Sequence, residues 1–173
     1  MSINPILIGY MGCGKTSVGE VLALDLDYDF YDLDTLIVEQ QSQEIGEIFQ
    51  QQGETSFRQI EHETLKTFLR SHTGYVLSVG GGTPCHHDHM NLMNKYAKTI
   101  YLQTSVSILF KRLRLQKISR PMIVQLSDES LHEFIVEHLP KREIFYEKAY
   151  KRINVNDRSV QEVALEIKTW YNQ

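Results

Sequence analysis

Residues 9–16 read Gly-Tyr-Met-Gly-Cys-Gly-Lys-Thr, which satisfies the pattern G-x-x-x-x-G-K-[ST]. The chain on either side restricts how this segment can fold. The apolar run at residues 6–8 precedes it, and Val18, Val21 and Leu22 follow it at helical spacing. A strand, a glycine-rich turn and a helix are the context in which this pattern forms a phosphate-binding loop. The motif therefore predicts an α/β fold that binds the phosphates of a nucleotide.

Each residue type in this loop has a mechanical task. The glycines allow the backbone to curl, so that several N–H groups point at one set of phosphate oxygens. Lys15 would place its ammonium group on the β- and γ-phosphates, and Thr16 would give its hydroxyl to Mg²⁺. The alternative is a glycine-rich turn with an incidental lysine, and the flanking strand and helix patterns argue against it.

The bulk properties of the chain narrow its class. Its 173 residues suit a single domain over residues 1–173, and 42% hydrophobic and 23% charged residues are typical of a globular protein in water. A net charge of −4 gives no basic excess for binding nucleic acid. We expect no signal peptide, no membrane span and, with two cysteines, no disulfide framework. These features predict a cytoplasmic protein.

Short apolar runs alternate with longer helical patterns along the chain. A capping box at Ser159 and Glu162 starts a last amphipathic helix. This alternation predicts a parallel sheet that is covered by helices on both faces. We expect strands at 5–8, 29–31, 75–79, 99–102 and 152–155, and the earlier helices at 15–26, 56–71, 88–96, 105–115 and 128–150.

Two carboxylates follow the second predicted strand, at the edge of the sheet where ligands bind in such folds. Asp32 and Asp34 would point the same way in an extended chain, toward the phosphate loop. One could hold a water molecule on Mg²⁺, and the other could accept a proton or hydrogen bond from an attacking hydroxyl group. The alternative is a solvated acidic turn with an aspartate at a helix N-cap.

Three glycines, Gly80–Gly82, follow the third predicted strand. They indicate a backbone that curls or that a ligand approaches closely, although a simple turn is the alternative. Many phosphate-loop enzymes place a metal-supporting aspartate at the end of this strand. Here Ser78 and Val79 stand there, so Asp32 is the expected carboxylate support for the metal.

Three arginines stand out by their surroundings. Arg58 lies near the start of a predicted helix, and Arg142 lies in the segment 140–146. A guanidinium group binds a carboxylate through two parallel hydrogen bonds, so two arginines suit a small acid. Arg120 lies in the basic segment 111–121, which could close over ATP as a flap. The alternatives are surface charges for the first two and a solvated helix face for the third.

The segment 85–89, Cys-His-His-Asp-His, has the composition of a metal site. No second ligand cluster with suitable spacing accompanies it. We therefore expect these residues to start a surface helix.

Taken together, these motifs resemble those of the shikimate kinases, small members of the nucleoside-monophosphate-kinase-like group. The resemblance covers essentially the whole chain, and any one of its six motifs would be weak evidence alone. In chain order, the motifs are Gly12–Thr16, Asp32/Asp34, Phe57-Arg58, Gly80–Gly82, Arg120-Pro121 and Arg142/Tyr146.

The resemblance implies a three-layer α/β/α sandwich with a central parallel sheet of about five strands, a P-loop and a mobile lid. The lid would span about 111–126, and a substrate-binding subregion would span about 33–61. The implied reaction transfers the γ-phosphoryl group of ATP to the 3-hydroxyl group of shikimate, in chorismate and aromatic amino-acid biosynthesis. The enzyme would need Mg²⁺ and would be a monomer.

The resemblance also implies roles for individual residues. Lys15, Asp34 and Arg120 would be catalytic, with Asp34 orienting the attacking hydroxyl group and Arg120 closing over ATP. Thr16 would bind Mg²⁺, and Asp32 would support the ion through water. The implied ATP contacts are Gly12, Cys13, Gly14, Lys15, Thr16, Ser17, Arg120 and Arg158. The implied shikimate contacts are Asp34, Arg58, Gly80, Gly81, Gly82 and Arg142.

Two other functions stay open from the residues alone. One is another small-molecule kinase of the same group, acting on gluconate or a nucleoside monophosphate. The other is a nucleotide-binding regulator without catalysis. Arg58 and Arg142 together favour an acceptor with a carboxylate, and the presence of Lys15, Asp34 and Arg120 favours catalysis.

Overall fold

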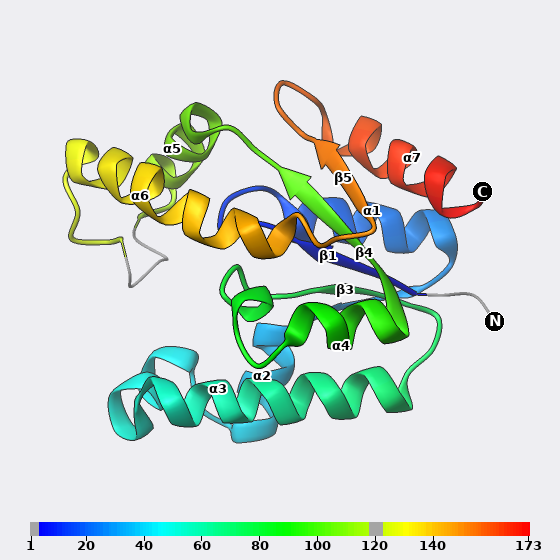
Figure 1. Cartoon of the computed structure of the whole chain (residues 1–173), viewed down its shortest axis with the longest axis horizontal. Coiled ribbons are helices and arrows are strands. Elements are labelled where there is room, and N and C mark those ends of the chain that lie inside the picture. The colour runs from blue at the N-terminus through cyan, green and yellow to red at the C-terminus, as the bar shows by residue number, and fades with distance from the viewer. Residues whose placement is uncertain (1–3, 118–122) are drawn as a thin grey trace.

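A computed structural model describes residues 4–117 and 123–173 of the chain. A five-stranded parallel sheet forms its centre, and helices flank the sheet on both sides (Figure 1). The strand order is β2-β3-β1-β4-β5, and every neighbouring pair runs parallel. The strands are β1 (Asn4–Ile8), β2 (Asp29–Asp32), β3 (Tyr75–Ser78), β4 (Ala97–Gln103) and β5 (Lys151–Asn154).

The helices pack in pairs around this sheet, α1 against α7, α3 against α4 and α5 against α6. Figure 1 shows α3 and α4 running side by side below the sheet. None of the helices in residues 4–117 and 123–173 has the length and apolar character that crossing a membrane requires. The helices are α1 (Lys15–Leu26), α2 (Leu33–Gln41), α3 (Ile45–Ser71), α4 (His89–Tyr96), α5 (Val106–Leu115), α6 (Asp128–Tyr146) and α7 (Val160–Tyr171), with a 3₁₀ turn η1 (Thr83–Cys85).

The central strand β1 explains why the sheet is covered on both faces. All five of its residues are buried, and Ile6, Leu7 and Ile8 are fully inaccessible to solvent. A strand that is apolar at successive positions cannot leave one face in water. Because the strands are parallel, their carboxyl ends lie along one edge, where β1, β2 and β3 end at Ile8, Asp32 and Ser78.

The predicted three-layer fold and five strands are confirmed, with strand ends that differ by at most two residues. The predicted helix after Ser159 is also present, with its capping box to Glu162. The predicted end of the fifth helix at residue 150 is wrong, because α6 ends at Tyr146 and a turn follows it.

Two further differences lie between β2 and β3. Helix α2 was not expected, and the extended chain expected at Asp32 and Asp34 is present at Asp32 but wrong at Asp34, which lies in α2. The alternative, an aspartate at a helix N-cap, is confirmed. Asp32 ends β2 and caps α2, because its Oδ1 accepts a hydrogen bond from the backbone N–H of Asp34 at 3.0 Å. Helix α3 begins at Ile45 instead of residue 56, since Gly53 interrupts the helix without ending it.

Candidate active site

The loop between β1 and α1 has the curled backbone that its glycines predict. Gly9, Gly12 and Gly14 have φ angles of 146°, 80° and 103°, which disfavour residues with a side chain. A Cβ on Gly12 would also stand 3.0 Å from the side chain of Leu113. The loop therefore depends on glycine at these positions for both backbone conformation and space.

Two cationic side chains lie against this loop. Lys15 Nζ donates hydrogen bonds to the carbonyl oxygens of Gly9 at 2.9 Å and Tyr10 at 3.2 Å. From α5, Arg112 Nη1 donates to the carbonyl oxygens of Gly12 at 3.3 Å and Cys13 at 3.0 Å. The sequence did not mark Arg112 as an individual site residue, because it is one of several basic residues in the segment 111–121.

A cavity of about 550 Å³ opens over the loop, at the carboxyl edge of the sheet. Its lining combines the loop, the ends of β2 and β3, and residues from α5 and α7, so distant parts of the sequence meet there. Among the residues predicted from sequence, it includes Gly12, Cys13, Gly14, Lys15, Thr16, Ser17, Asp32, Asp34, Gly80, Gly81 and Arg158.

Three charged side chains converge on the backbone of Gly80–Gly82. A Cβ added to the first glycine would stand 3.1 Å from Asp34 Oδ1. On the second glycine it would stand 3.3 Å from Arg142 Nη1, and on the third 3.0 Å from Arg58 Nη2. The absence of side chains on this loop therefore leaves room for one carboxylate and two guanidinium groups beside the phosphate loop.

Arg58 is held from below by buried polar groups. Its Nη1 donates to Glu61 Oε2 at 2.9 Å, and its side chain is 15% exposed. Glu61 is 1% exposed and also accepts a hydrogen bond from Thr83 Oγ1 at 2.6 Å. The Nε atom of Arg58 is also buried, and it has no hydrogen-bond partner among the described residues. Arg58 therefore has a fixed position and spare donor capacity.

Arg142 is held by aromatic rings. Its guanidinium carbon lies 5.3 Å from the ring centroid of Tyr10, which is a cation–π contact. Tyr146, one turn further along α6, donates its hydroxyl hydrogen to the carbonyl oxygen of Gly81 at 2.5 Å. Helix α6 thus carries both Arg142 and the tyrosine that bonds to the glycine loop.

The surroundings of Asp34 change its acidity. Burial, and after it the neighbouring carboxylates of Asp32 and Glu61, raise the pKa of this carboxyl group, while Lys15 and Arg58 lower it by less, so that the net pKa is about 6. A carboxylate with this pKa is ionised at pH 7 and still a better proton acceptor than an ordinary aspartate. Asp34 therefore combines the position and the basicity that a general base needs.

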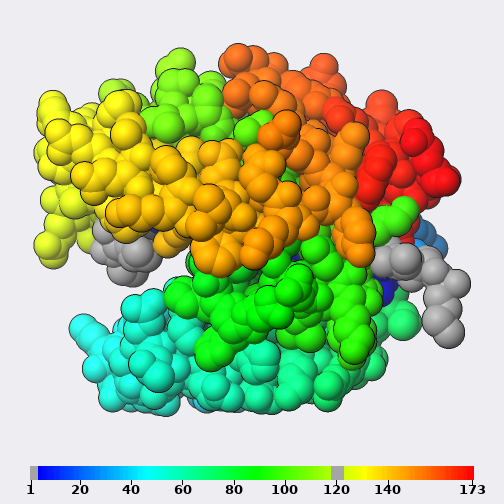
Figure 2. Space-filling model, viewed as in Figure 1, coloured from blue at the N-terminus to red at the C-terminus, as the bar shows by residue number. Residues whose placement is uncertain are grey.

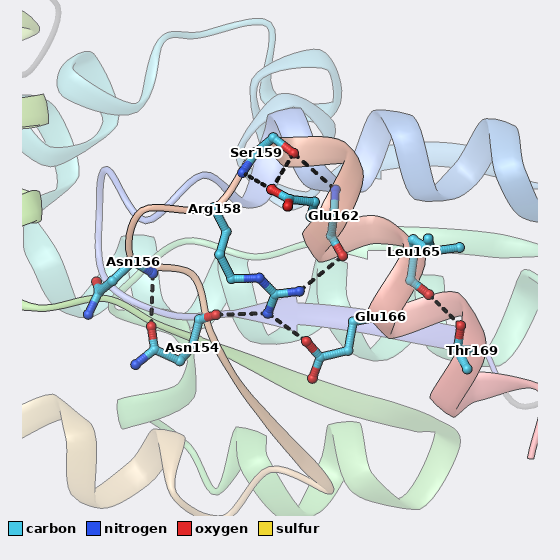
Figure 3. A network of polar contacts seen from close by, with 8 residues as sticks. All are labelled: Asn154, Asn156, Arg158, Ser159, Glu162, Leu165, Glu166 and Thr169. Carbon is cyan, nitrogen blue, oxygen red and sulfur yellow. Dashed lines mark hydrogen bonds and ion pairs between the residues drawn. The ribbon is translucent and has the colours of Figure 1, made fainter.

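Arg158 lines the same cavity and is held by a polar network (Figure 3). Its Nη1 contacts the carbonyl oxygen of Asn154 at 3.1 Å and the carboxylate of Glu166 at 2.5 Å. Its Nη2 donates to the carbonyl oxygen of Glu162 at 3.1 Å. These three bonds fix the guanidinium group in place, and its planar face and remaining N–H groups can still contact a ligand.

Two sequence predictions have different outcomes. Arg120 and the middle of the expected lid lie outside the residues that the structure describes. The helix expected at 88–96 is present as α4, which begins at His89 within the segment 85–89, although His89 itself is fully buried and not at the surface. No group of three His, Cys, Asp or Glu side chains in residues 4–117 and 123–173 is arranged to hold a metal ion.

Comparison with known proteins gives one consistent family. A sequence model of the shikimate kinase family matches residues 11–172. The shikimate kinase of Bacteroides fragilis is 40% identical over 167 residues, which cover 95% of this chain and 93% of that protein. The crystal structure of the Bacteroides thetaiotaomicron shikimate kinase matches 99% of both chains with a TM-score of 0.93 and 35% identity.

A shikimate kinase from Acinetobacter baumannii in complex with shikimate has a similar structure. It is 29% identical and covers 97% of this chain and 92% of its own, with a TM-score of 0.82.

Proposed function

The chain belongs to the shikimate kinase family, and from this we propose how its residues transfer the γ-phosphoryl group of ATP to the 3-hydroxyl group of shikimate. The products are shikimate 3-phosphate and ADP. One observation carries the assignment of residues: Asp34, Arg58 and Arg142 converge on Gly80–Gly82, directly beside a phosphate-binding loop. An acceptor that carries both hydroxyl groups and a carboxylate fits this combination.

The phosphate loop forms the donor half of the site. The backbone N–H groups of Gly12–Ser17 and the ammonium group of Lys15 bind the phosphates of ATP. Arg112, which contacts the loop from α5, adds positive charge at the same place. Arg158 also lines the cavity and is the candidate for contact with the adenine.

The chain's residues also fit a magnesium ion. The Thr16 hydroxyl and the Asp32 carboxylate line the same cavity, and both are oxygen ligands of the kind that Mg²⁺ prefers. Thr16 would bind the ion directly, and Asp32 would hold it through water. When bound with ATP, Mg²⁺ neutralises part of the phosphate charge.

The acceptor half carries out binding and proton removal. Arg58 and Arg142 bind the shikimate carboxylate between them, and the Gly81 backbone hydrogen-bonds the substrate. The Asp34 carboxylate hydrogen-bonds the 3-hydroxyl group, orients it toward the γ-phosphoryl group and accepts its proton. Arg120, outside the described residues, would close over ATP and stabilise the charge on the transferred group.

An assay that couples ADP release to a second enzyme tests this function. ATP, Mg²⁺ and shikimate should give turnover, and gluconate or a nucleoside monophosphate in place of shikimate should give none above background. Replacing Lys15 by alanine should lower turnover by at least about a hundredfold, because the transition state loses a stabilising cation. Turnover with the other acceptors, or near-normal turnover of the Lys15 variant, would contradict the site described above.

We also propose that the protein is a monomer in the cytoplasm. Both cysteines are free thiols, which suits a reducing compartment. Light scattering after size-exclusion chromatography should give a mass near 20.1 kDa, and a dimer mass would contradict the monomer.

A further inference from the structure

Two histidines meet beneath the acceptor half of the site. His62 lies on α3, and His89 is the first residue of α4 and fully buried. Their rings are nearly parallel, with centroids 5.2 Å apart, and His62 Nδ1 lies 3.0 Å from His89 Nε2. Neither histidine is among the described residues that line the cavity over the phosphate loop.

The hydrogen bonds of the pair fix its protonation. His89 Nδ1 lies 2.8 Å from the carbonyl oxygen of Thr83, and a carbonyl oxygen can only accept, so Nδ1 must carry the hydrogen. Burial lowers the pKa of His89, which keeps the ring neutral near pH 7 and leaves a lone pair on Nε2. His62 must therefore donate its Nδ1 hydrogen to His89.

Thr83 connects this pair to Arg58. Its carbonyl oxygen accepts the hydrogen bond from His89, and its hydroxyl donates to Glu61 Oε1 at 2.6 Å. The second oxygen of Glu61 accepts from Arg58 Nη1 at 2.9 Å. Thr83, Glu61 and His89 are all at most 1% exposed, so water does not compete for these bonds. The chain of bonds starts and ends on α3 and passes through η1, the turn that follows Gly80–Gly82.

We propose that His89, with His62 behind it, is a positioning residue for the acceptor: the pair fixes the η1 turn, Thr83 then orients Glu61, and Glu61 holds Arg58 where it binds the shikimate carboxylate. This inference rests on the proposed role of Arg58. It adds a second layer to the site that no residue pattern around Arg58 indicates, because His89 is separated from Glu61 by 27 residues of helix, strand and loop.

His87 provides an internal control. It is exposed, and its ring centroid lies 5.2 Å from that of His62 and 5.7 Å from that of His89. It therefore shares the neighbourhood of the pair without standing in the line of bonds from His62 to Arg58. A change at His87 should leave the position of Arg58 unaltered.

The test compares substitutions that differ in one hydrogen bond. His89→Leu removes both ring nitrogens and should raise the KM for shikimate by about three- to tenfold. Both kcat and the KM for ATP should stay within about twofold of the unsubstituted protein, because the phosphate loop and Asp34 keep their supports. His89→Asn, whose amide nitrogen can replace Nδ1, should restore the KM for shikimate to within about twofold of the unsubstituted protein.

Three further variants make each outcome decisive. His62→Leu, on the partly exposed side of the pair, should raise the KM for shikimate less than His89→Leu does, and it reports on the same link if His89→Leu fails to fold. His87→Leu should change nothing. Arg58→Ala tests the premise: an unchanged KM for shikimate in this variant removes the role of Arg58 itself and the inference with it.

A raised KM in Arg58→Ala, combined with normal values in His89→Leu or His62→Leu, overturns the positioning role alone. Equal losses in His89→Leu and His89→Asn also overturn it.

Discussion

Asp34 owes its chemistry to its position in the first turn of α2. Asp32 caps the helix directly before it, and Lys15 lies close enough to lower its pKa partly. The rise caused by burial and the neighbouring carboxylates exceeds the lowering caused by nearby cations, so the pKa is raised to about 6. Keeping this carboxylate ionised in a buried place costs free energy of folding. The same burial makes the group a stronger base near neutral pH, which suits proton transfer.

The pH dependence of catalysis should report this pKa. As the pH falls through about 6, Asp34 becomes protonated and can no longer accept the proton of the 3-hydroxyl group. We expect kcat/KM for shikimate to fall about tenfold per pH unit below that point. Asp34→Asn should lower kcat by about 10²–10⁴-fold and lack this limb. A limb that persists unchanged in Asp34→Asn would assign it to another group.

The same shift predicts a gain in stability from an inactivating substitution. The pKa of Asp34 is raised in the folded state above its ordinary value of 3.8, so the ionised form disfavours folding. This cost builds up as the pH rises from about 4 to about 6 and is complete above that range. Asp34→Asn should therefore be more stable than the unsubstituted protein by about 1–3 kcal/mol at pH 8, and the difference should shrink toward pH 4. Urea unfolding across this range measures it. Glu39→Gln, at an exposed position of the same helix, serves as the control and should give a difference near zero at every pH.

Residue patterns could single out Arg58 and Arg142 as candidates for binding the acceptor, but not the groups that hold them in place. Arg58 and Arg142 stand in short motifs with a chemical rationale, and both lie beside Gly80–Gly82. Arg112 contacts Gly12 across 100 residues of sequence, and nothing local distinguishes it from the basic residues around it. Partners such as this one depend on how the helices pack, which single-residue chemistry does not encode.

At the scale of elements, the break in α3 determines where Arg58 lies. Gly53 has φ 79° and ψ 171°, a conformation that only glycine adopts readily, and a capping box at Glu44 and Glu47 starts the segment before it. The helix therefore changes direction five residues before Arg58. Helix α2 was not predicted because its nine residues are too few for a clear helical pattern. Its N-cap residue, Asp32, was also interpreted as a candidate site residue.

Two glycines of α3 allow a matched test of this break. A Cβ on Gly53 or on Gly46 would meet no atom within 4 Å, so the two sites differ in backbone conformation alone. Gly53→Ala should lose about 1–2 kcal/mol of stability because its φ is positive. Gly46→Ala, inside the first helical segment, should gain up to about 1 kcal/mol. Thermal unfolding measures both, and a loss of equal size in the two variants would show that the break is not held by Gly53.

At the scale of the whole molecule, the proposed carboxylate site draws its two arginines from distant helices. Alternating strands and helices predicted a parallel sheet, but the strand order β2-β3-β1-β4-β5, which brings the ends of β1, β2 and β3 together, depends on tertiary packing. Arg58 comes from α3 and Arg142 from α6, and they approach successive glycines of the loop, Gly82 and Gly81. Figure 2 shows an open notch between the surfaces of these two helices. A carboxylate bound by both arginines would tie the two sides together.

Binding of shikimate should therefore stabilise the whole fold and need both arginines. At a free concentration one hundred times the dissociation constant, a ligand that binds only the folded state adds about 2.7 kcal/mol. For a chain of this size that corresponds to a rise in melting temperature of roughly 5–11 °C. At the same shikimate concentration, Arg58→Ala and Arg142→Ala should each lose most of this rise, because either change removes half of the carboxylate contact. Both variants should keep the rise caused by ADP and Mg²⁺, which bind at the other half of the site. If the rise with shikimate survived in either variant, the carboxylate would not be shared between α3 and α6.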